Sequence, residues 1–251
     1  MKLARTVILG VAGILVIPTL AAATLYRAEH VTGGNLDLVW APGFGVTATA
    51  QPLTLLPTDP AFANPSGDHT VLVATNMPVD SGGIILTATD PAGQSDYSWE
   101  GWMFTGDGNT RRGLVVRADP TNGFTSSYQF VIQSGLFQLN FRKLINSAPT
   151  TLGTWFANTL PGGAPLPNTW HRIAVVAVGS SFRCFWDGFE LTAGSPIMDT
   201  SIPTGWVGVY NFRFDLGSVP VYFDDLLLFA PDQSTPATHT SFGQLKARYR
   251  N

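Results

Sequence analysis

The chain has 251 residues, a formal net charge of -3 and only 12% charged residues, so it lacks the basic surface that nucleic-acid binding requires. Its hydrophobic content of 45% supports a sizeable core and excludes disorder for the bulk of the chain. A single cysteine excludes a disulfide framework and a multi-cysteine metal site. We therefore expect a turn-rich globular protein with no nucleic-acid partner.

The N-terminal sequence predicts a membrane span. Residues 6–26 contain no charged residue and are mostly apolar, which matches the roughly 20 residues that cross the hydrocarbon core as a helix. Lys2 and Arg5 precede this segment, and positive charge on that side favours a cytoplasmic N-terminus. We expect residues 1–27 to form a single-pass anchor, with the large domain in the periplasm or outside the cell.

A cleaved signal peptide fits the same residues. Val7–Ile17 would be its apolar core, Pro18 the helix breaker and Ala21–Ala23 the small-residue cleavage site. Both interpretations stay open at this point. We expect the anchor to be retained, because the apolar segment is long enough to insert stably.

Residues 28–68 are irregular and rich in proline and glycine, which predicts an extended linker with at most short strands at 36–40 and 46–50. From residue 69 to 230, short apolar or alternating runs are separated by turn residues such as Asp187–Gly188. No run keeps a helical period, so we expect an antiparallel β-sandwich, followed by a tail at residues 231–251. The expected strands are residues 71–75, 83–88, 99–104, 114–117, 128–133, 136–142, 171–178, 182–186, 206–210 and 221–229.

The last third of the chain carries a family resemblance. Trp170–Val175, Ser181–Gly188, Gly205–Tyr210 and Val221–Leu226 follow one another as a W-H strand, a hairpin through a D-G turn, a G-x-h-G-h strand and a final F-D-D strand. This order resembles the closing strands of the concanavalin A-like lectin/glucanase superfamily in its laminin-G-like bacterial form. The resemblance extends over about residues 71–229 and implies a jelly-roll sandwich in a bacterial protein. It implies no particular function, since that fold is found in lectins, glycosidases and structural modules.

A catalytic site is not expected. The glycosidases of this superfamily resemble one another in a strand motif E-x-D-x-x-E, which places two carboxylates on one face of the strand. The nearest match, Asp96 to Glu100, lacks the first glutamate. We expect Glu100 to be a sheet acid paired with Arg117, and we predict a protein that is not an enzyme. A jelly-roll glycoside hydrolase is kept as the second alternative.

No cofactor or metal is expected either. Some members of the superfamily bind calcium, and the adjacent carboxylates of Asp224 and Asp225 could contribute to such a site. The prediction is instead that Asp224 accepts backbone N–H groups beside a solvated Asp225. His171 has no partner at metal-ligand spacing, and Cys184 lies within an apolar strand, which predicts a buried thiol. Further calcium ligands would have to come from Asp107, Asp119 and Asp187.

The function expected from these features is that of a membrane-anchored accessory subunit. The sandwich, the linker and the tail would dock onto a larger membrane protein complex, for example a photosynthetic or respiratory one. The alternative is an envelope-tethered carbohydrate-binding module with a glycan as its partner. A tryptophan in the predicted loop at residues 150–167 would serve either role. The predicted partner-binding residues are Trp40, Phe44, Phe62, Trp155 and Phe242.

Overall fold

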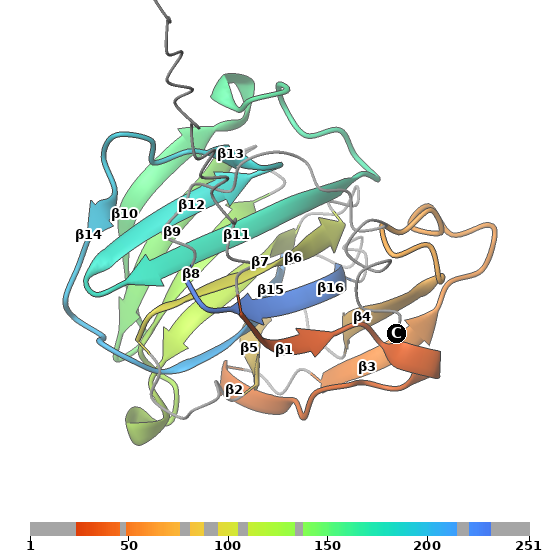
Figure 1. The fold of residues 1–251 in the computed structure, drawn as a ribbon, viewed down its shortest axis with the longest axis horizontal. Helices are drawn as coiled ribbons and strands as arrows, with labels where there is room; N and C mark the ends of the chain where they lie inside the picture. Colours follow the sequence, from red (N-terminus) through yellow and green to blue (C-terminus); the bar gives the residue numbers. More distant parts are fainter. Residues whose placement is uncertain are drawn as a thin grey trace, which may run out of the picture.

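The computed structural model describes residues 24–45, 49–75, 81–87, 95–104, 110–133, 138–214 and 221–231. Over these ranges the chain forms two antiparallel β-sheets that enclose one main core (Figure 1). The architecture is an all-β, jelly-roll-like sandwich, and the sequence prediction of this fold class is confirmed.

One sheet contains nine of the described strands, with the final long strand near its centre. Its hydrogen-bonded order is β13-β12-β11-β6-β16-β4-β3, with β1 paired to β16 and β14 paired to β12. The strands are β1 (Leu25–Glu29), β3 (Thr49–Thr54), β4 (Thr70–Thr75), β6 (Tyr97–Phe104), β11 (Trp170–Val178), β12 (Ser181–Trp186), β13 (Phe189–Glu190), β14 (Ile197–Met198) and β16 (Val221–Phe229).

The facing sheet contains seven described strands in the order β10-β9-β8-β7-β15-β5-β2. Three short 3-10 helices, η1 (Thr32–Gly34), η2 (Pro120–Asn122) and η4 (Ala157–Thr159), lie in the connections. The strands are β2 (Ala41–Gly45), β5 (Ser81–Thr87), β7 (Thr110–Ala118), β8 (Ser127–Gln133), β9 (Gln138–Ile145), β10 (Ala148–Phe156) and β15 (Trp206–Arg213).

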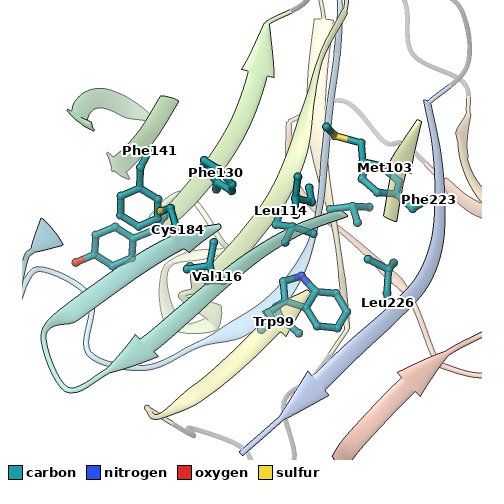
Figure 2. Packing of buried hydrophobic residues seen from close by; sticks show 14 of the residues in the cluster. Trp99, Met103, Leu114, Val116, Phe130, Phe141, Cys184, Phe223 and Leu226 are labelled. Atoms are coloured by element: carbon teal, nitrogen blue, oxygen red, sulfur yellow. The ribbon is translucent and has the colours of Figure 1, made fainter. Parts of the chain in front are cut away.

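The core lies between the two sheets and is built by strict alternation. In β8, Tyr128, Phe130 and Ile132 join the main buried cluster while the intervening residues point outward. Figure 2 shows Phe141 beside Cys184 and Leu226 near Trp99 within this core. Burial raises the pKa of the Cys184 thiol well above its usual value, and the prediction of a buried cysteine is confirmed.

The segment predicted as a linker contributes strands to both sheets. Strand β1 pairs with β16, β2 with β5 and β3 with β4. Leu36–Trp40 is not a strand, contrary to the prediction, because its backbone folds onto the carboxylate of Glu29. That buried carboxylate accepts the backbone N–H groups of Val31, Asp37 and Leu38 over 2.9–3.0 Å.

The predicted membrane anchor lies outside the described residues except at its C-terminal end. There, Leu25 and Tyr26 belong to strand β1, so a spanning helix cannot extend to residue 26 as predicted. Among the described residues, no helix has the length and hydrophobicity needed to cross a bilayer. The tail predicted at 231–251 lies beyond the described residues apart from Pro231.

Candidate functional site

The outer face of the seven-stranded sheet gathers polar and aromatic side chains. Because Tyr128 and Phe130 of β8 point into the core, Gln129 and Gln133 point to the opposite side. Strand pairing places Gln129 opposite Arg142 of β9 and Gln133 opposite Arg111 of β7. We call the set Arg111, Gln129, Gln133, Arg142 and Tyr210 the arginine face.

Hydrogen bonds hold both guanidinium groups of this face in place. Nε and Nη2 of Arg142 donate to Oε1 of Gln129 over 2.9 and 2.6 Å. Nη2 of Arg111 donates to Oε1 of Gln133 over 2.5 Å. Both acceptors are neutral amides, so the positive charges are oriented but not neutralised by these contacts.

An aromatic ring completes the face. The guanidinium carbon of Arg142 lies 4.9 Å from the centroid of the Tyr210 ring. Arg142 comes from β9 and Tyr210 from β15, and strands β8 and β7 lie between them. The two side chains must therefore extend along the sheet toward each other, above outward-pointing Val115 and Val131, which are 0% and 1% exposed.

Burial changes the electrostatics of the face. Desolvation lowers the pKa of the Arg142 guanidinium, and the positive charge of Arg111 lowers it further. Contact with Tyr210 acts in the opposite direction. Arg142 therefore carries a charge that the protein partly desolvates and places near a second charge of the same sign.

This combination suits the recognition of a saccharide. The Tyr210 ring is only 8% exposed and lies against the guanidinium of Arg142, so it holds that group in position on the face. Guanidinium and amide groups present donors and acceptors in fixed planes, as sugar hydroxyls require for specific hydrogen bonding. The groups of the face that a sugar can reach are the partly exposed Arg111, Gln133 and Arg142, whereas Gln129 is 1% exposed.

The predicted partner-binding residues do not form one surface. Trp40 donates its indole N–H to Glu29 over 2.8 Å, and Trp155 donates to the backbone oxygen of Leu191 over 3.0 Å. Both indoles are partly buried and pack against the main core. Trp155 lies in β10 rather than in a loop, so that part of the prediction is wrong: β10 pairs with β9 along its length.

The other predicted residues lie elsewhere. Phe62 stacks on His69 with 3.9 Å between ring centroids. Phe44 packs against the outward cluster that contains Tyr210, so among the described residues of the set it is the one that borders the arginine face. Phe242 lies outside the described residues. A role of these residues in partner binding stays a prediction.

The carboxylates considered for catalysis are used in structural contacts. Glu100 pairs with Arg172 over 2.5 Å, and the predicted partner Arg117 is instead buried with its Nη2 on the backbone oxygens of Ser95 and Gly179. Arg117 lies on the facing sheet. Arg172 lies on β11, which pairs with β6, and is two residues from Ala174, the register partner of Glu100. Asp96 precedes β6 and accepts the backbone N–H of Gly179 over 2.8 Å, so it does not share a strand face with Glu100.

The two acids of the last strand are both buried. Asp224 accepts the backbone N–H of Ser66 and the amide of Asn64, as predicted for a structural aspartate. Asp225 was expected to be solvated, but it is 0% exposed and contacts Nδ1 of His30 over 2.6 Å. The irregular pairing after Asp224 turns Asp225 toward this histidine.

The aspartates considered as further calcium ligands lie in turns of their own. Asp119 caps η2 through the N–H of Thr121, and Asp187 contacts Nδ1 of His171 over 2.7 Å. Asp107 falls outside the described residues. No group of three or more histidine, cysteine or acidic side chains with the spacing of a metal site occurs in the described ranges.

Sequence reasoning missed one constellation, formed by Thr169, His171 and Asp187. Nε2 of His171 lies 2.9 Å from the hydroxyl of Thr169, and its Nδ1 contacts Asp187. The order hydroxyl, imidazole, carboxylate matches a nucleophile triad, but the Thr169 hydroxyl donates to the backbone oxygen of Leu166 over 2.5 Å. The contact between His171 and Asp187 joins the strand that begins with Trp170 to the Asp187–Gly188 turn. These two sequence motifs were the available signal for the constellation.

Comparisons with known proteins find solved structures with a similar fold and no match to the sequence itself. No family model matches the sequence. No curated protein matches it either. The carbohydrate-binding module CBM66 from Bacillus subtilis matches with a TM-score of 0.53 and 15% identity, covering 77% of this chain and 98% of that one.

Two further solved structures match. Domain 4 of AbnA, an extracellular arabinanase from Geobacillus stearothermophilus solved with arabinotriose, gives a TM-score of 0.50 at 11% identity, covering 90% of this chain and 98% of that one. A GlcNAcα1-4Gal-releasing endo-β-galactosidase from Clostridium perfringens gives 0.55 at 14% identity, covering 84% and 64%. At such identities the likeness shows the fold alone. The chain therefore shares its two-sheet antiparallel sandwich fold with these proteins.

Proposed function

We propose that the protein is a non-catalytic carbohydrate-binding domain that binds a saccharide on the arginine face. The observation that carries the proposal is the arrangement of Arg142, Gln129 and Tyr210, in which a buried amide and a buried ring hold a partly exposed guanidinium on one outer sheet face. The solved structures with the same fold include a carbohydrate-binding module and a domain bound to arabinotriose. These likenesses support sugar binding better than docking onto a membrane complex.

The absence of catalysis is part of the proposal. Its support is that Glu100 is paired with Arg172 and that Asp96 is held by a backbone contact, so neither is positioned as an acid or nucleophile. We also propose that residues 1–23 hold the domain on the outer side of a bacterial cytoplasmic membrane, as the apolar segment predicts. The domain would then bind glycans close to the cell surface.

A pair of matched variants tests the binding face. Tyr210 and Tyr222 lie on the outer faces of different sheets and are 8% and 9% exposed. Full-length protein is screened on a glycan array, and the best glycan is titrated against Tyr210→Ala and Tyr222→Ala, with circular dichroism to confirm folding. We expect Tyr210→Ala to weaken binding about tenfold or more and Tyr222→Ala to leave it unchanged. Absence of glycan binding, or equal loss in both variants, would contradict the proposal.

A further inference from the structure

The charges of the two sheets are distributed unequally. The seven described strands of the β10-to-β2 sheet contain no aspartate or glutamate, although acidic residues outnumber basic ones in the whole chain. The facing sheet has five acids among its described strands, including Glu100, Asp224 and Asp225. The basic residues of the acid-free sheet are Arg111, Arg112, Arg117, Arg142, Lys143 and Arg213.

Three of these basic residues bond to groups inside the protein. Arg112 is fully buried and donates to the backbone oxygen of Phe104 over 2.9 Å. Arg117 is fully buried on backbone oxygens, and Lys143 pairs with Asp199 over 2.6 Å. Their charges serve the fold and are turned away from the outer face.

Arg111 and Arg142 are different. In the described part of the chain, neither guanidinium has a carboxylate partner, and their hydrogen bonds go to the neutral amides of Gln133 and Gln129. Nearby aromatic rings limit their access to water: Arg111 lies 5.4 Å from the ring of Phe214. Two partly desolvated like charges on one face cost free energy unless an anion approaches them.

The donor geometry also suits an anion. A guanidinium has five N–H donors in one plane, and Gln129 takes two of those of Arg142. N–H groups of the Arg142 guanidinium therefore remain for a ligand. They lie in one plane as a pair that fits two oxygens of one carboxylate or sulfate. The contacts with the glutamine amides fix the plane of each guanidinium before a ligand binds. Less side-chain entropy is therefore lost on binding.

We propose that the saccharide bound on the arginine face carries an anionic group, a carboxylate or a sulfate, that Arg111 and Arg142 recognise together. This inference rests on the proposed function and adds the chemical class of the ligand. The hydroxyls of the sugar ring would contact the partly exposed Gln133, while the buried Gln129 and Tyr210 would hold Arg142 in position.

The test uses full-length protein and four defined glycans. These are an oligogalacturonate, the same oligosaccharide with its carboxylates methyl-esterified, a sulfated galactan and a neutral galactan. Each is titrated against the wild type, Arg111→Met, Arg142→Met and the control Arg183→Met. Arg183 carries the same charge on the facing sheet, where it is paired with Glu190, so the control changes net charge without touching the arginine face.

The expected result is that at least one anionic glycan binds and that Arg111→Met and Arg142→Met each weaken it about tenfold or more, with Arg183→Met unchanged. Tight binding of oligogalacturonate identifies a carboxylate ligand, and tight binding of sulfated galactan identifies a sulfate. Should a methionine variant fail to fold, Arg142→Lys and a salt titration of the wild type give the same information. Binding to an anionic glycan should then weaken with rising salt.

Two outcomes would overturn the inference. If a neutral glycan binds as tightly, and is lost in Tyr210→Ala but retained in both arginine variants, the ligand is not anionic while sugar binding on this face stands. If Arg183→Met weakens binding as much as Arg142→Met, the attraction is general and the arginine face has no special role. Failure of all four glycans and of the array would reject the proposed function itself.

Discussion

The indole N–H of Trp99 in β6 donates to the backbone oxygen of Gly208 in β15 over 2.9 Å, which joins the two sheets by a polar contact inside the core. Trp99 is 0% exposed, so water cannot replace the bond in the folded state. We predict that Trp99→Phe lowers the free energy of unfolding by about 1–3 kcal/mol, because a buried carbonyl loses its donor. Urea unfolding measures the change. A loss no larger than that of Trp206→Phe, which alters a half-buried indole, would contradict this role.

The stability of the protein should fall as pH rises toward neutrality. Burial, and then the charge of Asp225, raise the pKa of the Asp224 carboxyl from 3.8 to about 7. Between these values the folded protein binds more protons than the unfolded chain, so this contribution is complete below pH 3.8 and is lost as pH rises through about 7. The opposite contribution of Asp199, whose pKa is lowered, changes only at acid pH.

Asp224→Asn tests this relationship, because an amide can accept from Ser66 but does not titrate. Urea unfolding from about pH 5 to about pH 8 should show a loss of stability in the wild type that is smaller in the variant by on the order of 2 kcal/mol. Parallel pH profiles of the two proteins would refute the assignment.

Glu100→Gln should lower the stability of the protein slightly and should remove no hydrolytic activity. The substitution removes a partly exposed ion pair with Arg172, which is worth about 1 kcal/mol or less. A sensitive assay on β-glucans should detect no turnover in either protein. Hydrolysis by the wild type that disappears in the variant would establish an enzyme and overturn the non-catalytic proposal.

The N-terminal segment should be retained in the cell. Residues 6–23 keep an uncharged sequence that can insert into a bilayer up to the start of β1 at Leu25. Protein extracted from membranes with detergent should therefore begin at Met1 by N-terminal sequencing. A chain that begins at Thr24 would show that the segment is a cleaved signal peptide.

Alternating strands were predictable from the sequence, and irregular ones were not. Strand β8 places core-facing residues at every second position because one side packs into the core, and β11 is apolar from Ile173 to Val178. β10 contains Pro149 and Gly153 and has an irregular pairing with β9, so its sequence resembles a loop. The short strands β1 to β3 have no clear period either, and only pairing with strands far along the chain defines them.

The candidate site was beyond sequence reasoning for a related reason. Arg142 and Tyr210 are far apart in the chain and meet only because β8 and β7 lie between their strands in the sheet. The acid-free composition of this sheet is likewise visible only when each strand is assigned to one of the two sheets. Motif reading instead favoured tryptophans, which the fold uses mainly for packing.

The pairing of β1 with β16 determines how the sandwich would respond to tension. A domain held by a bound glycan and tethered through Thr24 would be pulled at the open end of this antiparallel pair, where the N–H of Ala230 bonds to Thr24. A force acting across the two strands would separate β1 from β16 one hydrogen bond at a time instead of shearing the whole ladder. This separation would proceed along β1 as far as Glu29. The buried carboxylate of Glu29 accepts several backbone N–H groups of the residues that follow, and these bonds would resist further separation.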